Sequence, residues 1–300
     1  MKGFDLVRKN LRNKARYHLR LHWKENPGKA LKYLLWLTQV RDDKSPYPLQ
    51  AKIEITRRCP LNCRMCIRPS LPLYPDLSIS EYYRIINELP NLSVLSPHGY
   101  GEPLCHKNFT GLMQYSAERG IKIHLTTNGV LLIPEISRSF IPKSRPIRIT
   151  FSVDAGTKKE YEWIRRGASF EVLTDNIREA CKIAKRVGTK TTIACTYGSW
   201  NKDQIIPVSA LAYQLGVNSV TFSDLTLHGV GLATEDHKVK TDPQVKKDLE
   251  VARSKYGRRV NIGYTVNKQT TEHPRCVRPW ISTFIQSNGD VYPCTDTLDY

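Results

Sequence analysis

Three closely spaced cysteines are the residues of this sequence best suited to do chemistry. Cys59, Cys63 and Cys66 have the spacing C-x3-C-x2-C and follow directly after a predicted strand at residues 51–56. A loop that leaves the end of a strand can wrap three thiolates around one inorganic centre. Because residues 1–10 hold no apolar export signal, the clustered thiols favour metal binding over a disulfide framework.

Three cysteines without a fourth nearby leave one coordination position of the centre open. A structural zinc site is closed by four protein ligands, whereas an iron–sulfur cluster held by three cysteines keeps one iron free for another ligand. Two alternatives stay open here: a zinc loop that borrows Cys105 or His106, and reduced thiols that hold no metal. We expect the neighbouring Arg57, Arg58 and Arg64 to lower the pKa values of the thiols and to offset the thiolate charge.

Further motifs stand at the ends of the next three predicted strands. Residues 99–104 read Gly-Tyr-Gly-Glu-Pro-Leu, residues 126–129 read Thr-Thr-Asn-Gly, and residues 152–154 read Ser-Val-Asp, followed by Ile-Arg-Arg-Gly at residues 164–167. Each motif alone is a weak signal. Their order behind the cysteine triad resembles the radical S-adenosylmethionine (radical SAM) superfamily, over about residues 50–225.

The resemblance implies the cofactors and the reaction. Cys59, Cys63 and Cys66 would hold a [4Fe–4S] cluster, whose open iron would bind the amino and carboxylate groups of S-adenosyl-L-methionine. In this superfamily the reduced cluster cleaves S-adenosyl-L-methionine to methionine and a 5′-deoxyadenosyl radical, which abstracts a hydrogen atom from the substrate. A one-electron donor such as flavodoxin or ferredoxin is implied as a partner. The substrate, a peptide or a small molecule, is not identified.

The superfamily motifs also imply which residues contact S-adenosyl-L-methionine. Gly101 and Glu102 match the motif that accepts hydrogen bonds from the methionine ammonium group, for which a carboxylate is suited. Met65 stands where the superfamily usually has an aromatic residue near the adenine, a place that a thioether can also fill. Ser152 matches a position that contacts the ribose, and Arg165 matches one that can meet the carboxylate. The further candidates are Thr127 and Asn128.

Two more cysteines lie in the C-terminal part of the sequence. Cys294 closes a G-x4-C spacing that starts at Gly289, and Asn288-Gly289 is a turn signal of a β-hairpin. This segment resembles the start of the SPASM or Twitch module, which carries auxiliary iron–sulfur clusters, so Cys276 and Cys294 are candidate auxiliary ligands. Only two of the expected cysteines are present, so either the chain is a fragment or the auxiliary site is incomplete. The alternative is a hairpin with buried thiols.

Strands alternate with helices from residue 51 onward, which predicts parallel β-α-β units. The prediction is an α/β fold with a partial (β/α)6 barrel, whose active site lies at the carboxyl ends of the strands. The expected domains are a basic amphipathic helical arm with a linker at residues 1–48, the barrel at 49–228, and an extension at 229–300 with a small, separate β-hairpin module. The expected strands are 51–56, 93–96, 121–126, 147–153, 191–195, 219–223 and 259–265, and the expected helices are 80–89, 109–119, 134–140, 170–187, 204–215 and 242–254.

The charge of the chain bears on its partners and not on its fold. The formal net charge is +18, and residues 1–44 carry 12 basic and 4 acidic residues. Such a field favours anionic partners. A basic excess is more often a solvated surface, however, so nucleic acid is not the favoured partner, and the arm is expected to pack on the barrel instead of docking on an anionic lipid or substrate. Since no apolar run approaches the ~20 residues of a membrane span, we expect a cytoplasmic protein without a transmembrane segment.

The rival to a radical enzyme is a non-enzymatic metal-binding scaffold. It is either a zinc-stabilised basic module that binds RNA, or a chain that holds the iron–sulfur cluster without turnover. The sequence identifies no catalytic side chain. Asp224 and His228 follow the sixth predicted strand and would face the barrel mouth, whereas Cys181 and Cys195 lie in helix and strand patterns that favour core packing.

Overall fold

The computed structural model describes residues 13, 16–21, 27–28, 31, 35–36, 47–225, 232–237, 243–265 and 278–293. Its strands are β1 (Gln50–Ile53), β2 (Val94–Ser96), β3 (Lys122–Thr127), β4 (Arg148–Ser152), β5 (Lys190–Tyr197), β6 (Ser219–Asp224), β7 (Asn261–Thr265), β8 (Ser282–Ile285) and β9 (Val291–Tyr292). They form one sheet in the order β7-β6-β5-β4-β3-β2-β1-β8-β9. Neighbouring strands are parallel throughout, except that β8 and β9 are antiparallel.

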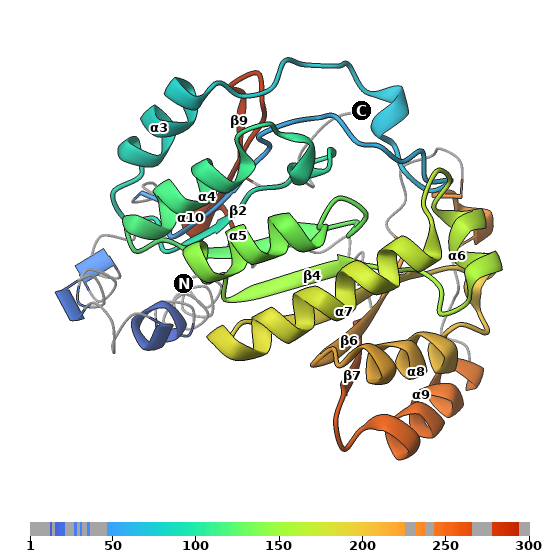
Figure 1. The fold of residues 1–300 in the computed structure, drawn as a ribbon. Helices are drawn as coiled ribbons and strands as arrows, with labels where there is room; N and C mark the ends of the chain where they lie inside the picture. Colours follow the sequence, from blue (N-terminus) through green and yellow to red (C-terminus); the bar gives the residue numbers. More distant parts are fainter. Residues whose placement is uncertain are drawn as a thin grey trace, which may run out of the picture.

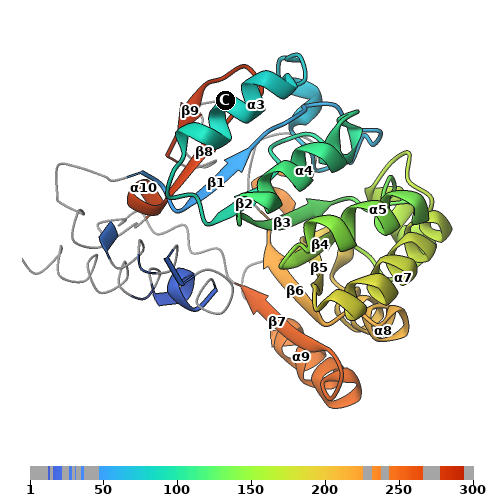
Figure 2. The same cartoon turned by 60° about the vertical axis from the view of Figure 1, so that its left-hand side comes forward.

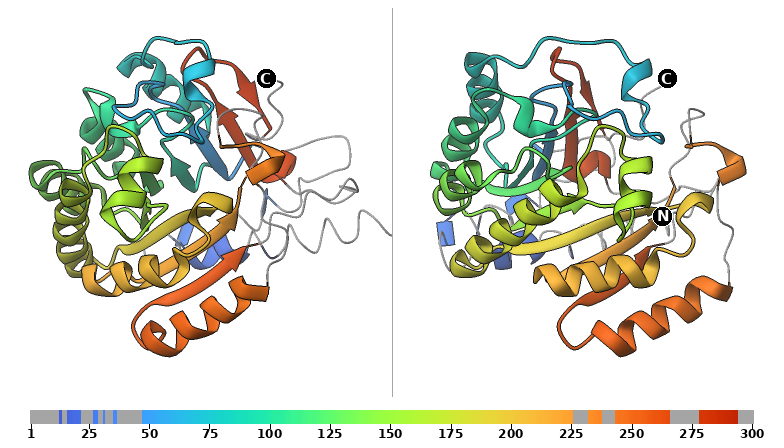
Figure 3. Two further views of the ribbon diagram at one scale, coloured as in Figure 1. Left: turned by 90° about the vertical axis from the view of Figure 1, so that its right-hand side faces the viewer. Right: turned by 45° about the vertical axis from the view of Figure 1, so that its right-hand side comes forward.

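Helices cover the outer, convex face of the sheet (Figure 1). They are α3 (Ile79–Glu88), α4 (Phe109–Glu118), α5 (Pro134–Ser144), α7 (Phe170–Val187), α8 (Ile205–Leu215) and α9 (Pro243–Tyr256). The short helices α6 (Lys158–Ile164) and α10 (Arg278–Ile281) lie at the two ends of the strands instead. The short 3-10 helices are η1 (Arg68–Ser70), η2 (Pro103–Cys105), η3 (Ser199–Asn201) and η4 (Glu235–His237). The sheet is strongly curved, and the β8–β9 hairpin and β7 lie at opposite ends of an open arc (Figure 3).

Local sequence signals fix where the longer helices begin and end. Ser78 and Glu81 form a capping box, in which the Ser78 hydroxyl accepts from the Glu81 backbone N–H and the Glu81 carboxylate accepts from the Ser78 N–H. Ser169 caps the start of α7, and Gly188 ends it with a φ of 77°, in the left-handed region that glycine favours. These signals explain why the bounds of α7 agree with the predicted helix at 170–187.

Alternation along the strands separates an apolar outer face from a polar inner face. In β3, Ile123 and Leu125 are fully buried and belong to the main core. Lys122, His124 and Thr126, which alternate with them, are half-buried on the inner face. The core therefore lies between sheet and helices, and the concave side of the arc is left with polar side chains.

The predicted α/β architecture with a parallel, barrel-like sheet is confirmed. All six predicted barrel strands are present as β1 to β6, in the predicted order along the chain. Helix α6 was not predicted, because its seven residues are too short for a clear periodic pattern. Helix α5 continues past residue 140 to Ser144, with Pro142 in its last turn.

The C-terminal hairpin is not the separate module that the sequence indicated. Strand β8 pairs in parallel with β1, so that Ala51 lies opposite Thr283, and Phe284 is fully buried. Figure 2 shows β8, β1, β2 and β3 side by side in one continuous sheet. At the other edge, β7 adds a seventh parallel strand next to β6. Residues on both sides of the predicted boundary at 228 thus share one sheet, and the domain boundaries themselves stay predictions.

Several predicted features lie wholly or partly outside the described residues. Cys276, Cys294 and His228 belong to this group, as does most of the N-terminal arm. In the described part of the arm, His18 is buried, and its Nδ1 lies 2.7 Å from the Ser93 hydroxyl. No helix in the described ranges is long and apolar enough to cross a membrane.

Candidate functional site

One cavity of about 340 Å³ lies at the carboxyl ends of the strands and brings together most of the predicted site residues. The cysteine loop after β1 forms one wall, and the loops after β2, β3 and β4 form the others. Its lining residues are Cys59, Cys63, Met65, Cys66, Ile67, His98, Gly99, Tyr100, Gly101, Glu102, Thr126, Thr127, Asn128, Ser152, Arg165, Thr196 and Leu225. All eight cofactor-contact and cluster residues predicted from the superfamily motifs are among them.

Backbone hydrogen bonds fasten the cysteine loop to the segment that follows α6. The Asn62 N–H donates to the carbonyl of Arg166 at 2.9 Å, and the Arg64 N–H donates to the carbonyl of Ile164 at the same distance. The Ile-Arg-Arg-Gly motif therefore positions the loop as well as lining the site. Gly167 has a φ of 91°, which a residue with a Cβ rarely adopts.

Each cysteine sulfur of the loop accepts an N–H hydrogen bond from outside its own turn or from the residues that follow it. The Asn128 side-chain Nδ2 lies 3.7 Å from Cys59 Sγ, and an Arg165 guanidinium nitrogen lies 3.8 Å from Cys63 Sγ. The third donor is the backbone N–H of Arg68, 3.4 Å from Cys66 Sγ. Donors of this kind stabilise thiolates that bind a metal centre.

The predicted pKa shift of the thiols is wrong in sign. Burial is the largest effect, and it raises the pKa of Cys59 to about 11 and also raises the pKa of Cys63. The cations that partly oppose burial are Arg68 at Cys59 and Arg165 at Cys63. A metal centre that binds these thiols must therefore displace their protons.

The three arginines that were expected to act on the thiols are engaged elsewhere. Acidic side chains or a backbone carbonyl hold all three. These contacts stabilise the start of the cysteine loop and do not offset the charge of the thiolates. Their partners are Glu54 for Arg57, Asp76 for Arg58 and the backbone carbonyl of Trp163 for Arg64.

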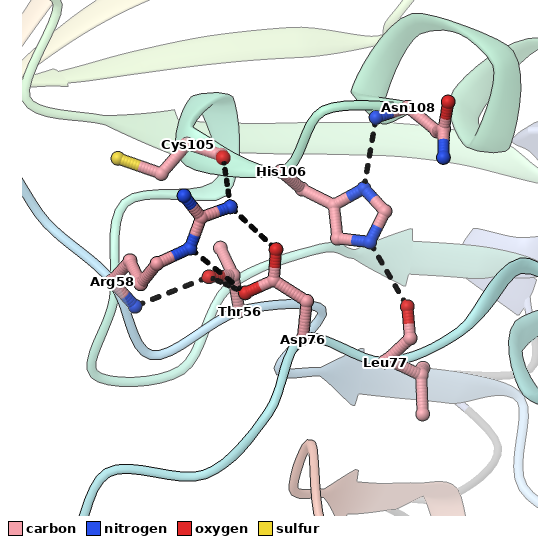
Figure 4. A network of polar contacts seen from close by, with 7 residues as sticks. All are labelled: Thr56, Arg58, Asp76, Leu77, Cys105, His106 and Asn108. Atoms are coloured by element: carbon pink, nitrogen blue, oxygen red, sulfur yellow. Dashed lines mark hydrogen bonds and ion pairs between the residues drawn. The ribbon is translucent and has the colours of Figure 1, made fainter.

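The zinc alternative needs a further ligand beside the three loop cysteines, and His106 is not free to serve as one. The His106 Nε2 donates to the Leu77 carbonyl at 2.9 Å, and its Nδ1 accepts from the Asn108 N–H at 3.2 Å, so both ring nitrogens are occupied (Figure 4). In the part of the chain that the structure describes, no three His, Cys, Asp or Glu side chains converge on a single metal ion.

The Gly-Glu pair of residues 101–102 lies against the start of the cysteine loop. A Cβ at Gly101 would stand 2.2 Å from the carbonyl oxygen of Thr56, so only glycine fits. The buried carboxylate of Glu102 accepts from the Thr127 hydroxyl and the Asn128 N–H, each at 2.7 Å. Burial outweighs these bonds and raises the pKa of Glu102 to about 7.

Arg165 makes a buried ion pair at the opposite wall of the cavity. One of its guanidinium nitrogens lies 2.7 Å from Oδ2 of Asp154, whose other oxygen, Oδ1, accepts from the Thr196 N–H at 2.8 Å. Its Nε is buried and has no hydrogen-bond partner among the described residues, which leaves a donor for an anionic group. Ser152 and Met65 line the same cavity.

Some site features were not evident from the sequence. Asp154 stands in the quoted Ser-Val-Asp motif, but its pairing with Arg165 depends on a tertiary contact across the site. His98, just before the Gly-Tyr-Gly-Glu-Pro motif, lines the cavity with a buried Nδ1 that lacks a partner among the described residues. Asp224, predicted at the barrel mouth, accepts a hydrogen bond from the Tyr264 hydroxyl and is not among the lining residues.

The isolated cysteines behave as the sequence predicted. Cys181 and Cys195 are buried in the main core, where burial raises the pKa of Cys181 to about 11. Both are therefore packing residues.

A family model described as the radical SAM superfamily matches residues 53–208, somewhat more than half of the chain. The chain belongs to the radical SAM superfamily. Its match begins in β1 and ends in α8, so it contains the cysteine loop and every cofactor-contact residue named above.

Relatives of this radical SAM protein include the PqqA peptide cyclase of Bradyrhizobium diazoefficiens, which is 24% identical over 264 residues, 82% of this chain and 66% of the relative. Streptococcus suis SuiB bound to S-adenosylmethionine is similar in fold, with a TM-score of 0.67 at 18% identity over 88% of this chain and 64% of SuiB. anSMEcpe with bound AdoMet and Cp18Cys peptide has a TM-score of 0.61 at 18% identity, over 84% of this chain and 75% of that one. The chain thus spans about two thirds of the length of the cyclase and of SuiB.

The cofactors of the superfamily are a [4Fe–4S] cluster and S-adenosyl-L-methionine, and the cavity residues fit both. Cys59, Cys63 and Cys66 offer three thiols spread around one cavity, as a cluster requires when each thiolate binds a different iron. The buried Glu102 carboxylate suits an ammonium group, and the unpartnered Nε of Arg165 suits a carboxylate.

Proposed function

We propose that this radical SAM protein is an enzyme that abstracts hydrogen from a peptide substrate. The observation that carries the proposal is the convergence of three thiols, one buried carboxylate and one buried guanidinium on a single cavity. When bound and reduced, the cluster supplies the electron that cleaves S-adenosyl-L-methionine to methionine and a 5′-deoxyadenosyl radical. An external one-electron donor, such as flavodoxin or ferredoxin, must provide that electron.

The chain's own residues would bind and orient the cofactor. In this proposal Glu102 holds the methionine ammonium group, and the Gly101 backbone approaches it closely because no Cβ intervenes. Arg165 holds the carboxylate through its free Nε–H, while Asp154 keeps the guanidinium in place. Ser152 would face the ribose and Met65 the adenine. Fixed donors and acceptors of this kind orient the reacting bond without reorganisation.

A peptide substrate is favoured over a small molecule because several similar proteins are named for a peptide or are bound to one. The matching cyclases carry the name of the peptide PqqA, and solved neighbours hold the precursor peptide SuiA or the Cp18Cys peptide. These names support a substrate class only, since the chain covers about two thirds of the first of them. The two-cysteine auxiliary site at Cys276 and Cys294 is not needed for cofactor cleavage in this proposal.

Reductive cleavage without substrate tests the activity. Anaerobically reconstituted wild-type protein, treated with dithionite, should form 5′-deoxyadenosine and methionine from S-adenosyl-L-methionine. Cys66→Ala should form neither, whereas Cys276→Ala should still cleave the cofactor. A loaded cluster that never cleaves S-adenosyl-L-methionine would favour the scaffold hypothesis, and a colourless, zinc-containing wild type would remove the radical enzyme altogether.

Deuterium transfer tests the substrate class. A substrate peptide, supplied in perdeuterated form, should pass deuterium to 5′-deoxyadenosine, which mass spectrometry detects. If deuterium transfer occurs only from deuterated small metabolites, the peptide proposal is wrong although the radical chemistry stands.

A further inference from the structure

The hydrogen bond from Asn128 to Cys59 differs from those to the other two cysteines. Asn128 follows directly after β3 and reaches across the cavity to a loop 69 residues earlier in the chain. The donor to Cys66 is a backbone N–H, which only a proline substitution would remove, and the donor to Cys63 is a guanidinium that also pairs with Asp154. Asn128 alone can therefore lose its donor without a change of side-chain charge.

The amide of Asn128 is fixed in the orientation that points its nitrogen at the sulfur. Its Oδ1 accepts from the Val130 N–H at 3.0 Å, which leaves Nδ2 as the group 3.7 Å from Cys59 Sγ. The backbone N–H of the same residue donates to Glu102 at 2.7 Å. Asn128 is almost fully buried, with 6% of its surface exposed.

The turn that carries Asn128 is itself held rigidly. Asn176 of α7 donates through Nδ2 to the carbonyls of Gly129 at 3.0 Å and Val130 at 2.9 Å. Gly129 has a φ of 79°, and a Cβ there would stand 2.8 Å from the Leu173 side chain. The donor is thus held in place by α7 and does not depend on a bound cofactor for its position.

We propose that Asn128 is a positioning residue that raises the reduction potential of the [4Fe–4S] cluster by donating a hydrogen bond to the Cys59 thiolate. Reduction adds negative charge to the cluster, and an N–H dipole directed at a ligand sulfur stabilises the more negative state. The inference rests on the proposed function, because it presumes the cluster. It goes further in assigning part of the redox tuning to one uncharged side chain.

The same residue links the cluster to the cofactor site. Its side chain contacts Cys59 and its backbone contacts Glu102, so one rigid turn fixes the distance between a cluster ligand and the carboxylate proposed for the methionine ammonium group. Asn128 acts through these two groups and touches no reacting atom itself.

A redox titration of the reconstituted protein, followed by EPR in the absence of S-adenosyl-L-methionine, tests the proposal. Asn128→Leu keeps the size and charge but removes the donor, and we expect its midpoint potential to be more negative. At the potential where the wild-type cluster is half reduced, the ratio of reduced to oxidised cluster should fall about tenfold, a shift of about 59 mV for one electron. Thr126 lies on β3, two residues before Asn128, and lines the same cavity, so Thr126→Val is the control and should leave the potential unchanged.

An unchanged potential in Asn128→Leu, or an equal shift in Thr126→Val, would overturn the proposal. If Asn128→Leu does not retain a cluster, a measurement on the wild-type protein tests the proposal instead. Wild-type protein labelled with ¹⁵N at asparagine side-chain amides should show a weak nitrogen coupling to the reduced cluster in pulsed EPR. We assign this coupling to Asn128, because Asn62, the asparagine of the cysteine loop, is exposed. A loaded wild type without this coupling refutes the role of Asn128, whereas a wild type that forms no cluster refutes the proposed function instead.

Discussion

At the scale of single residues, burial governs the chemistry of the cysteine loop. The thiols lie in an environment that disfavours free thiolates, and each is met by an N–H donor. Such a site is poorly suited to a reactive free cysteine and well suited to a thiolate whose charge is shared with a metal centre. If one of the three cysteines is lost, we therefore expect the two remaining thiols not to retain the metal centre.

Cys63→Ala should abolish cluster loading, because two thiolates do not retain a cluster that three hold. Iron and sulfide content and visible absorption after anaerobic reconstitution measure the effect. Cys105→Ala is the matched control, since Cys105 is also half-buried but is not a predicted ligand of the iron–sulfur cluster, and it should load fully. Full iron content in Cys63→Ala would refute the ligand assignment.

The raised pKa of Glu102 predicts pH-dependent cofactor binding. Burial favours the neutral carboxyl up to about pH 7, whereas an ammonium ligand favours the carboxylate. Below about pH 7 the group must therefore lose a proton on binding, and the affinity for S-adenosyl-L-methionine should fall by up to about tenfold per pH unit. Calorimetry on the cluster-loaded protein measures this dependence.

Glu102→Gln should bind at least about tenfold more weakly at pH 8 and should lose the pH dependence, since a charge-assisted hydrogen bond contributes about 1.5–3 kcal/mol. Glu88→Gln, at an exposed position of α3, is expected to behave as the wild type. Equal affinity of Glu102→Gln and wild type at all pH values would remove Glu102 from the cofactor site.

At the scale of elements, the close approach of two loops determines whether the site can form. Gly101 lets the loop after β2 rest on the start of the cysteine loop, where the Glu102 N–H donates to the Arg58 carbonyl at 2.8 Å. The site therefore depends on backbone-to-backbone contact between segments 45 residues apart.

Gly101→Ala should push these loops apart, because its Cβ would stand 2.2 Å from the Thr56 carbonyl oxygen. We expect the free energy of unfolding to fall by about 1–3 kcal/mol, typical of overpacking, together with weaker cluster retention. Gly111→Ala provides the control: nothing lies within 4 Å of its Cβ, and it should stabilise α4 by about 0.5–1 kcal/mol. Denaturation by urea compares the two variants, and a neutral Gly101→Ala would contradict the packing argument.

Elements with a strong local signal could be predicted from the sequence, whereas those defined by tertiary contact could not. The capped 18-residue helix α7 agrees with its predicted bounds, and β2, β3 and β4, which end in polar motifs, agree with theirs to within one residue at each end. Strand β8 has only four residues, and its pairing with β1 joins segments more than 200 residues apart, so its place in the sheet is not a local property.

The candidate site shows the same division. The cysteines, Glu102 and Arg165 could be predicted because the superfamily's motifs fix their order and spacing. The partners of the charged groups could not be, because Arg57 turns to Glu54 and Arg165 to Asp154 only in the folded chain. The expected sign of the thiol pKa shift was wrong because burial outweighs the nearby cations, and those cations are Arg68 and Arg165 instead of the arginines that had been expected.

At the scale of the whole molecule, the polar inner face of the open arc affects the stability of the protein. Two half-buried histidines stand there, His98 and His124, and both are held neutral. Burial, together with the charge of Lys52 and the neighbouring ring, lowers the pKa of His98 to about 3, and burial with nearby Arg148 and Lys52 lowers that of His124 to about 4. Burial of Glu102 acts in the opposite direction and raises its pKa to about 7.

These shifts predict how stability depends on pH. Below about pH 6.5, the usual pKa of histidine, the unfolded chain takes up protons on His98 and His124 that the folded chain does not, so the free energy of unfolding falls as the pH falls towards 4. Between about pH 4.5 and 7, by contrast, folded Glu102 keeps a proton that the unfolded chain has lost, which stabilises the fold at the lower end of that range. Of these three groups, the two histidines outweigh the glutamate and together favour a loss of stability on acidification from about pH 6.5 to 4.5.

The variant His98→Gln isolates the contribution of one histidine to the pH dependence of the free energy of unfolding, because Glu102 and His124 contribute equally to variant and wild type. Below about pH 6.5 the wild type should lose up to about 1.4 kcal/mol per pH unit more than the variant, whereas above about pH 7 the difference between them should be constant. Urea denaturation at about pH 5, 6, 7 and 8 measures both curves under the same conditions. A difference that does not change between pH 5 and 7 would mean that His98 takes up its proton as readily in the folded chain as in the unfolded one, and that its ring is solvated instead of enclosed by the barrel.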